Sequence, residues 1–293
     1  MTTALQPRSA SAASPLPAAV RAARIVHPFP TLLNAAATAG LAFVASDGSP
    51  DTGIVVRMVV VMLLVQCAIG VTNDVFDREL DARTKPWKPI AAGLVTPRAA
   101  VVLALAFLVA SLALAVTLGP AGFGLAALGA ACGMAYDMKF KRTVFSAVPY
   151  AVAIPTLPLW VYVSLDRAEP VLWWLLPLGA LIGVTLHLAN TLPDIEADAA
   201  NGVRGLAHRL GVTRSMQVSW LMFAAALGLA AALGPFLEAD MRWYAGSLAT
   251  GAACLLAAVR AYAVRGEAAL RLNFAATSIG TAVTAVGWLA AVT

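Results

Sequence analysis

Apolar runs recur along the whole chain, and short segments between them hold most of the charged residues. Each run is about twenty residues long, enough to cross the hydrocarbon core of a bilayer as a helix. Lipid offers no hydrogen-bond partners to a backbone, so runs of this length indicate helices rather than open sheets. The chain is 12% charged, where a soluble domain carries about 25%. The sequence therefore predicts an all-α polytopic membrane protein.

Clusters of charged residues, Gly and Pro divide the apolar sequence into nine candidate spans. They cover roughly residues 25–46, 54–73, 98–118, 120–136, 144–164, 171–193, 213–234, 242–263 and 270–292. We expect nine transmembrane helices in one bundle around a central cavity, as a single domain over residues 21–293. Residues 1–20 are rich in Ala, Ser and Pro and lack the apolar region of a signal peptide. They are expected to form a disordered cytosolic tail.

Positive charge is unevenly distributed between the two sides that nine crossings define. Only Arg57, Arg167 and Arg242 fall on the side away from the N-terminus, which leaves 17 of the 20 Lys and Arg residues on the other side. Short loops rich in Lys and Arg stay cytosolic. We therefore expect a cell-membrane protein with a cytosolic N-terminus and an external C-terminus. The net charge of +5 is then a topology signal, and nucleic-acid binding is not expected.

An acidic cluster follows the second span, on the cytosolic side. If the helix continues beyond the span, Asp74, Asp77 and Asp81 lie at i, i+3 and i+7, within about 60° of one another. Three carboxylates on one helix face repel one another, and nearby lipid desolvates them, unless a cation lies among them. Such hard oxygen ligands suit Mg²⁺, which completes its shell with water and substrate phosphate.

A second acidic stripe ends the sixth span, at the same face of the membrane. Asp194 and Asp198 are four residues apart, and Asn190 and His187 extend the stripe back into the span. A helical bundle can bring both acidic ends together across a cavity. With Lys and Arg in the intervening loops, this arrangement suits a diphosphate bridged by Mg²⁺. A membrane cavity would also dissolve an isoprenoid tail and keep dry the carbocation that an allylic diphosphate leaves.

These motifs resemble the signatures of the UbiA superfamily of intramembrane prenyltransferases. The first is Asn73-Asp74-x-x-Asp77-x-x-x-Asp81, followed by Arg83-Thr84-Lys85-Pro86-Trp87-Lys88-Pro89-Ile90-Ala91-Ala92-Gly93. The second is Asp194-x-x-x-Asp198 with Gly202 and Leu210-Gly211, and between them Tyr136 with Lys141-Arg142 is similar to an intermediate Tyr/Lys motif. The similarity covers nearly the whole chain, in order and at family-like spacing.

The resemblance implies Mg²⁺-dependent transfer of a prenyl group from an isoprenoid diphosphate to a lipophilic or aromatic acceptor within the lipid bilayer. By carry-over, the expected metal ligands are Asn73, Asp74, Asp77, Asp81, Asp194 and Asp198. The expected diphosphate contacts are Asn73, Tyr136, Lys141, Arg142 and Arg204. The expected catalytic residues are Asp74, Asp194, Asp198 and Lys141. Candidate acceptor contacts are Arg24, Asn34, His187 and Asn190.

Several positions leave alternatives open. The family spacing is often Tyr-x-x-x-Lys, whereas Lys139 and Lys141 stand three and five residues after Tyr136. We favour Lys141 for the diphosphate because Arg142 completes a basic pair, and we interpret Lys139 as a membrane anchor. His187 equally fits a hydrogen bond within the bundle, and Arg24 equally fits an anchor at the lipid headgroups.

Two aromatic clusters, Trp160 with Tyr162 and Trp173 with Trp174, fall near the expected external interface. Trp and Tyr gather at membrane interfaces, so a belt role is favoured over stabilisation of a carbocation.

Two alternative functions fit the acidic pattern. One is a terpene cyclase of the same fold, which uses the diphosphate without an acceptor. The other is a transporter or cation channel, but acids concentrated at one membrane face, with none in mid-span, argue against a path through the membrane.

Overall fold

The computed structural model describes residues 17–200, 202–237, 239–262 and 266–293. Most of the tail expected at residues 1–20 therefore lies outside the described residues. At its end, Ala18 already begins a short helix, α1 (Ala18–Ala23).

Regular structure in the described ranges is entirely helical, as the sequence predicts. The long helices are α2 (Pro28–Val44), α3 (Thr52–Phe76), α5 (Pro97–Ala115), α6 (Gly119–Met138), α7 (Val148–Ser164), α8 (Leu175–Thr191), α10 (Leu206–Leu233), α11 (Met241–Ala261) and α12 (Glu267–Val292). Short helices α4 (Arg78–Thr84) and α9 (Ile195–Ala200) and several 3-10 turns lie between them. Each predicted span overlaps one long helix.

Six stretches of the described chain are long and apolar enough to cross a membrane. One of them, Pro97–Met138, is 42 residues long and contains both α5 and α6. The backbone of Gly119, with a φ of 82°, separates these two helices. Helices α2 and α7 are apolar but shorter, at 17 residues each. The protein is therefore an integral membrane protein.

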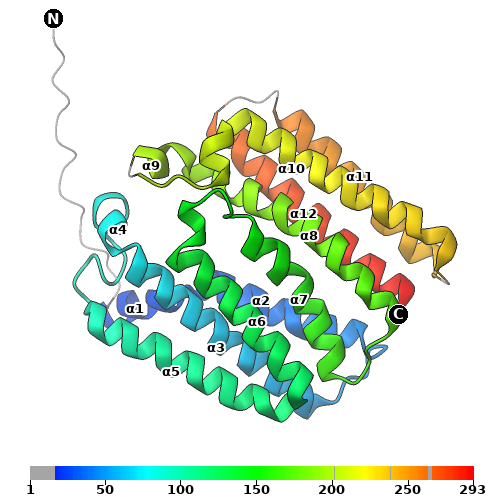
Figure 1. Ribbon diagram of the computed structural model, residues 1–293, viewed down its shortest axis with the longest axis horizontal. Coiled ribbons are helices and arrows are strands. Elements are labelled where there is room, and N and C mark those ends of the chain that lie inside the picture. Colours follow the sequence, from blue (N-terminus) through cyan, green and yellow to red (C-terminus); the bar gives the residue numbers. More distant parts are fainter. Residues whose placement is uncertain (1–16, 201, 238, 263–265) are drawn as a thin grey trace, which may run out of the picture.

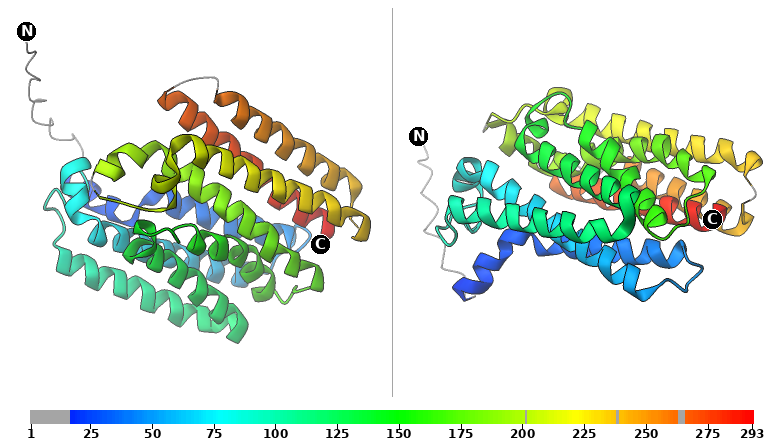
Figure 2. Two further views of the ribbon diagram at one scale, coloured as in Figure 1. Left: turned by 45° about the horizontal axis from the view of Figure 1, so that its top comes forward. Right: turned by 60° about the horizontal axis from the view of Figure 1, so that its bottom comes forward.

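The helices form a bundle with a cavity between α2, α3, α6 and α7. Helix α5 packs on the outer side of α3, and α10 and α12 pack against α8. Helices α1, α4 and α9 lie together at one end of the bundle, whereas the C-terminus lies at the opposite end (Figures 1 and 2). The end with the short helices is the one that carries both acidic motifs.

Close packing of α7 on α8 determines the positions of side chains at this end of the bundle. A Cβ added at Gly183 of α8 would lie 2.4 Å from the carbonyl oxygen of Tyr150, so the two backbones approach as closely as glycine allows. The contact brings the ring of Tyr150 beside His187, with a centroid separation of 5.1 Å.

A packed hydrophobic cluster fills the other end of the bundle and includes Trp160 and Tyr162. These two side chains are 2% and 1% exposed, so their predicted place in an interfacial belt is wrong. The physical reason is that α7 is enclosed by α6 and α8, which leaves this face no contact with lipid. Trp173 and Trp174 are 67% and 42% exposed, as residues of an interfacial belt would be.

Candidate active site

A cavity of about 610 Å³ extends from the short helices into the bundle. Its polar end is lined by Asp77 and Asp81 of the first acidic motif and by Asp194 and Asp198 of the second. The structure therefore brings the two motifs to one cavity, as the sequence predicts. Asp74 lines a second, smaller pocket of about 230 Å³, which shares His27, Pro30 and Lys88 with the main cavity.

The first acidic motif is bent at its middle aspartate. Helix α3 ends at Phe76, and Asp77 takes a non-helical conformation (φ −95°, ψ 2°) before α4 begins. The assumption of one uninterrupted helix is therefore wrong at this residue, whose side chain contacts Lys141 and Arg142 of another segment. All three carboxylates of the motif remain buried, with Asp74 at 1%, Asp77 at 8% and Asp81 at 3% exposure.

Lys88 is the cation that lies among these carboxylates. Its Nζ is 2.8 Å from Oδ1 of Asp74 and 2.8 Å from Oδ2 of Asp81, and it donates to Oδ1 of Asn73 at 3.3 Å. Burial alone would lower the pKa of Lys88, but the attraction of Asp74 and Asp81 outweighs it and raises that pKa. Repulsion among these carboxylates predicts a cation here, and in this structure a lysine of the chain provides it.

His27 contacts the same oxygen of Asp74 as Lys88 does. Its Nε2 lies 2.9 Å from Oδ1 of Asp74, and its backbone is left-handed (φ 48°, ψ 65°) at the start of α2. The other oxygen of Asp74, Oδ2, is buried and has no hydrogen-bond partner among the described residues. Sequence reasoning missed His27 because no local pattern links it to an acid 47 residues away.

Asp77 is paired with two basic residues that follow α6. Lys141 Nζ contacts its Oδ2, and Arg142 Nη2 donates to its Oδ1 at 2.9 Å. The Lys141 side chain is 10% exposed and lines the cavity. Lys139 is an exposed residue at the C-cap of α6. The structure thus brings Lys141, and not Lys139, to the acidic cluster.

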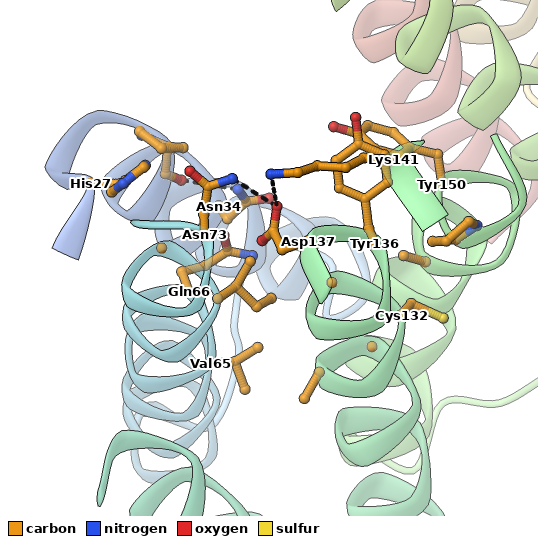
Figure 3. A pocket seen from close by; sticks show the side chains of 18 of the residues that line it. His27, Asn34, Val65, Gln66, Asn73, Cys132, Tyr136, Asp137, Lys141 and Tyr150 are labelled. Atoms are coloured by element: carbon orange, nitrogen blue, oxygen red, sulfur yellow. Dashed lines mark hydrogen bonds and ion pairs between the residues drawn. The ribbon is translucent and has the colours of Figure 1, made fainter. Parts of the chain in front are cut away.

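Asp137 is a further carboxylate of the cavity that sequence reasoning missed. It is 3% exposed, and its Oδ1 accepts a hydrogen bond from Asn73 Nδ2 at 2.8 Å (Figure 3). Asn73 Nδ2 also donates to Asp77 Oδ2 at 3.2 Å, which occupies both amide hydrogens. The carbonyl oxygen of Asn73 is thereby directed at Lys88. The one available signal was an acid in the last turn of an apolar helix.

The second acidic motif is more accessible than the first. Asp194 ends the 3-10 turn Leu192–Asp194 and its side chain is 56% exposed, with Oδ2 3.9 Å from Lys85 Nζ. Asp198 lies in α9, with His208 Nε2 3.7 Å from its Oδ2. Burial and the neighbouring charge of Asp194 raise the pKa of Asp198. Arg204 is exposed, and the described residues that line the cavity do not include it.

The candidate acceptor residues divide into three groups. Asn34 and Asn190 line the main cavity. Arg24 is exposed and lines the smaller pocket. His187 is buried, and its Nε2 is 2.9 Å from Ser146 Oγ. It therefore makes a hydrogen bond within the bundle, which was one of its two predicted roles.

Tyr150 is a cavity residue that the sequence did not single out. Its ring contacts those of Tyr136 and His187, with centroids 5.2 Å and 5.1 Å away, and these two rings also contact each other at 5.8 Å. The local sequence around Tyr150 does not indicate a site, because the cluster of three rings is assembled from three different helices, α6, α7 and α8.

The oxygen atoms around Lys88 form a cradle that suits a hard cation. Oxygens of Asp74, Asp81 and Asn73 converge on one ammonium group, and Asp74 offers a further buried, unpaired oxygen. Donor sets made only of oxygen suit Mg²⁺. Within the described ranges, no three Asp, Glu, His or Cys side chains are arranged around one metal position in this structure. A metal here would therefore need phosphate and water as further ligands.

Comparison with known proteins decides the family. Residues 33–290 match the UbiA prenyltransferase family. The chain belongs to this family. It is 28% identical over 240 residues to digeranylgeranylglyceryl phosphate synthase of Methanoregula boonei, covering 81% of this chain and 85% of that protein. It is 26% identical to 4-hydroxybenzoate octaprenyltransferase of Vibrio atlanticus, covering 78% and 81%.

The fold of this UbiA-family chain matches a solved relative. A UbiA homologue from Archaeoglobus fulgidus bound to GPP and Mg²⁺ superposes with a TM-score of 0.67 at 18% identity, over 91% of this chain and 99% of that one. Family membership confirms the predicted enzyme class, a prenyltransferase, over the transporter or channel.

Proposed function

We propose that this prenyltransferase moves a prenyl group from an isoprenoid diphosphate to a lipophilic or aromatic acceptor, in a Mg²⁺-dependent reaction inside the membrane. One observation carries the proposal: both acidic motifs and Lys141 lie at the polar end of a cavity whose other end is apolar. A donor with a charged diphosphate head and an isoprenoid tail matches these two ends. The relatives named for prenyl transfer support the same reaction.

The acidic residues are the proposed ligands of Mg²⁺ and its diphosphate. The proposed set is Asn73, Asp74, Asp77, Asp81, Asp194 and Asp198. The free oxygen of Asp74 and the exposed carboxylate of Asp194 support this assignment. When bound, Mg²⁺ would draw charge from the diphosphate and make it a better leaving group.

The basic residues are proposed to exchange partners when the donor binds. Lys88, Lys141 and Arg142 hold carboxylates in this structure and would turn to phosphate oxygens once a metal takes those carboxylates. As the allylic C–O bond breaks, its electron pair leaves with the diphosphate. Lys141 opposes the negative charge that grows there, so it acts mainly in the transition state.

The cavity wall has the complementary task of excluding water. Water would otherwise capture the electron-poor prenyl group before the acceptor reaches it. The acceptor forms its new bond to the carbon that the diphosphate left, and it gives up one proton in exchange. Asn34 and Asn190, which line the cavity, are the proposed acceptor contacts.

We further propose nine crossings in a single transmembrane domain, with the active site at the cytosolic face. A continuous 42-residue helix would be about 63 Å long, twice the hydrocarbon core, so α5 and α6 cross separately. Helices α2 and α7, of 17 residues each, are at the lower limit for crossing. Together with the other five apolar stretches, these make nine.

Product analysis tests the proposed reaction. Purified protein is incubated with C10, C15 and C20 diphosphates and Mg²⁺, with and without 4-hydroxybenzoate or a glycerol phosphate lipid, and the products are identified by mass spectrometry. We expect a prenylated acceptor. A cyclic hydrocarbon that forms without an acceptor would instead identify a terpene cyclase.

A further inference from the structure

Beyond its acidic end, the cavity continues as a mostly apolar shaft between α3, α6 and α7, with Gln66 and Thr156 as polar lining residues. Figure 3 shows Val65 on α3 below Asn73, and Cys132 on α6 below Tyr136. The deepest lining residues on the three helices are Val61, Leu125 and Trp160.

The three walls of the shaft end at a similar depth. Val61 lies twelve residues from Asn73 along α3, and Leu125 lies twelve from Asp137 along α6, which places each about 18 Å below the polar end. Trp160 lies ten residues from Tyr150 along α7, about 15 Å down.

Packed side chains close the shaft below this level. Met58, the next turn of α3 after Val61, is 0% exposed, and Val161 and Tyr162 of α7 are 0% and 1% exposed. These residues and Trp160 belong to one hydrophobic cluster. Trp160, the largest side chain at this level, therefore sits at the boundary between open shaft and packed core.

We propose that Trp160, with Val61 and Leu125, is the floor of the donor-tail channel and limits the prenyl chain that the enzyme accepts to about C20. This inference rests on the proposed function and adds the donor length to it. An extended isoprenoid unit adds four C–C bonds, or roughly 5 Å, so a shaft of 15–18 Å holds about three units and part of a fourth. A C40 tail, at roughly 40 Å, would be more than twice as long as the shaft.

Gly129 offers an independent way to change the depth. It lines the shaft eight residues from Asp137, about 12 Å down, and a Cβ added there meets nothing within 4 Å. A leucine at this position would project into open space and raise the floor by more than one isoprenoid unit. The two substitutions, at Trp160 and at Gly129, should therefore shift the accepted length in opposite directions.

The test compares donor lengths in wild type and variants. Diphosphate release is measured as kcat/KM with C10, C15, C20, C30 and C40 all-trans diphosphates at saturating Mg²⁺ and acceptor. Wild type should lose at least about tenfold between C20 and C30, Trp160→Ala should restore C30 relative to C20 about tenfold, and Gly129→Leu should lower C20 relative to C10 about tenfold. The matched control is Trp173→Ala, an exposed tryptophan outside the cavity, which should keep the wild-type profile.

The possible outcomes distinguish a failure of the proposed channel floor from a failure of the proposed function. A profile that is flat from C10 to C40, or the same in all folded variants, would show that the tail leaves the cavity sideways and would overturn the floor. If Trp160→Ala does not elute as a folded protein in size exclusion, Gly129→Leu decides alone, because its added side chain enters open space. Absence of release from every donor by wild type would overturn the proposed function, and the floor with it.

Discussion

The ammonium of Lys88 lies 2.8 Å from Oδ1 of Asp74, a carboxylate that is 1% exposed. The same ammonium contacts Asp81 at 2.8 Å, so one positive charge is shared between two buried acids. Asp74 and Asp81, the proposed metal ligands, and Lys88, a proposed phosphate contact, thus also form ion pairs with one another at the polar end of the bundle. If Mg²⁺ binds these carboxylates as proposed, stability and metal binding are coupled at this lysine.

Lys88→Gln should destabilise the metal-free protein. Removal of one partner leaves buried carboxylates uncompensated, at a cost of about 3–5 kcal/mol. Thermal unfolding in detergent with EDTA should show a lower Tm, and Mg²⁺ should raise the Tm of this variant more than that of wild type. Lys139→Gln, at an exposed lysine, serves as the control. A Lys88→Gln protein as stable as wild type in EDTA would contradict the coupling.

The two acidic motifs should respond differently to alanine. Asp194→Ala should abolish turnover but change the free energy of unfolding by no more than about 0.5 kcal/mol, because its side chain is 56% exposed. Asp74→Ala should abolish turnover and also destabilise the protein, because it leaves the buried side chains of Lys88 and His27 without their partner. Diphosphate release and unfolding are measured on each variant. Near wild-type release from Asp194→Ala at saturating Mg²⁺ would remove that residue from the mechanism.

The two lysines after Tyr136 should differ in kinetics. Lys141→Gln should lower kcat by two to three decades, as expected for a lost oriented donor worth about 2.7–4 kcal/mol in a dry site. Lys139→Gln should be mild, since that side chain is exposed. Steady-state kinetics of both variants give the ranking, and the reverse order would assign the diphosphate to Lys139.

Gly205→Ala should impair catalysis through the backbone. A Cβ at this position would lie 2.5 Å from the carbonyl oxygen of Lys141, so the segment that carries Lys141 must move. We expect kcat to fall about tenfold, the penalty of a modest misplacement of a catalytic group. Gly228→Ala, where a Cβ meets nothing within 4 Å, is the control. Equal activity of the two variants would show that the position of Lys141 is not critical.

Nine crossings predict opposite locations for the two ends of the chain. Reporter fusions should place the N-terminus in the cytosol and Thr293 outside, because 17 of 20 positive charges lie on the N-terminal side. A cytosolic Thr293 would contradict nine crossings and the shared face of the two acidic motifs.

Local patterns in the sequence predicted the helices well. Each apolar run became a helix, and the division of residues 97–138 at Gly119 followed from its position between two runs. Four of the five motif aspartates, Asp77, Asp81, Asp194 and Asp198, line one cavity, because the two motifs follow helices that end at the same side. What the patterns could not predict are pairings between distant segments: Lys88 with Asp74, His27 with Asp74, and Asn73 with Asp137.

The error at Trp160 has the same origin. A tryptophan near a helix end has the composition of an interfacial belt, but its exposure depends on which helices pack around α7. Burial of this kind is a property of the assembled bundle and leaves no trace in the local sequence.

The most direct measurement of the central claim is metal-dependent release of diphosphate from a C15 donor in the presence of an acceptor. We predict rapid release by wild type with Mg²⁺, none above background with EDTA, and none from Asp194→Ala under either condition. Release at equal rates with Mg²⁺ and with EDTA would contradict it.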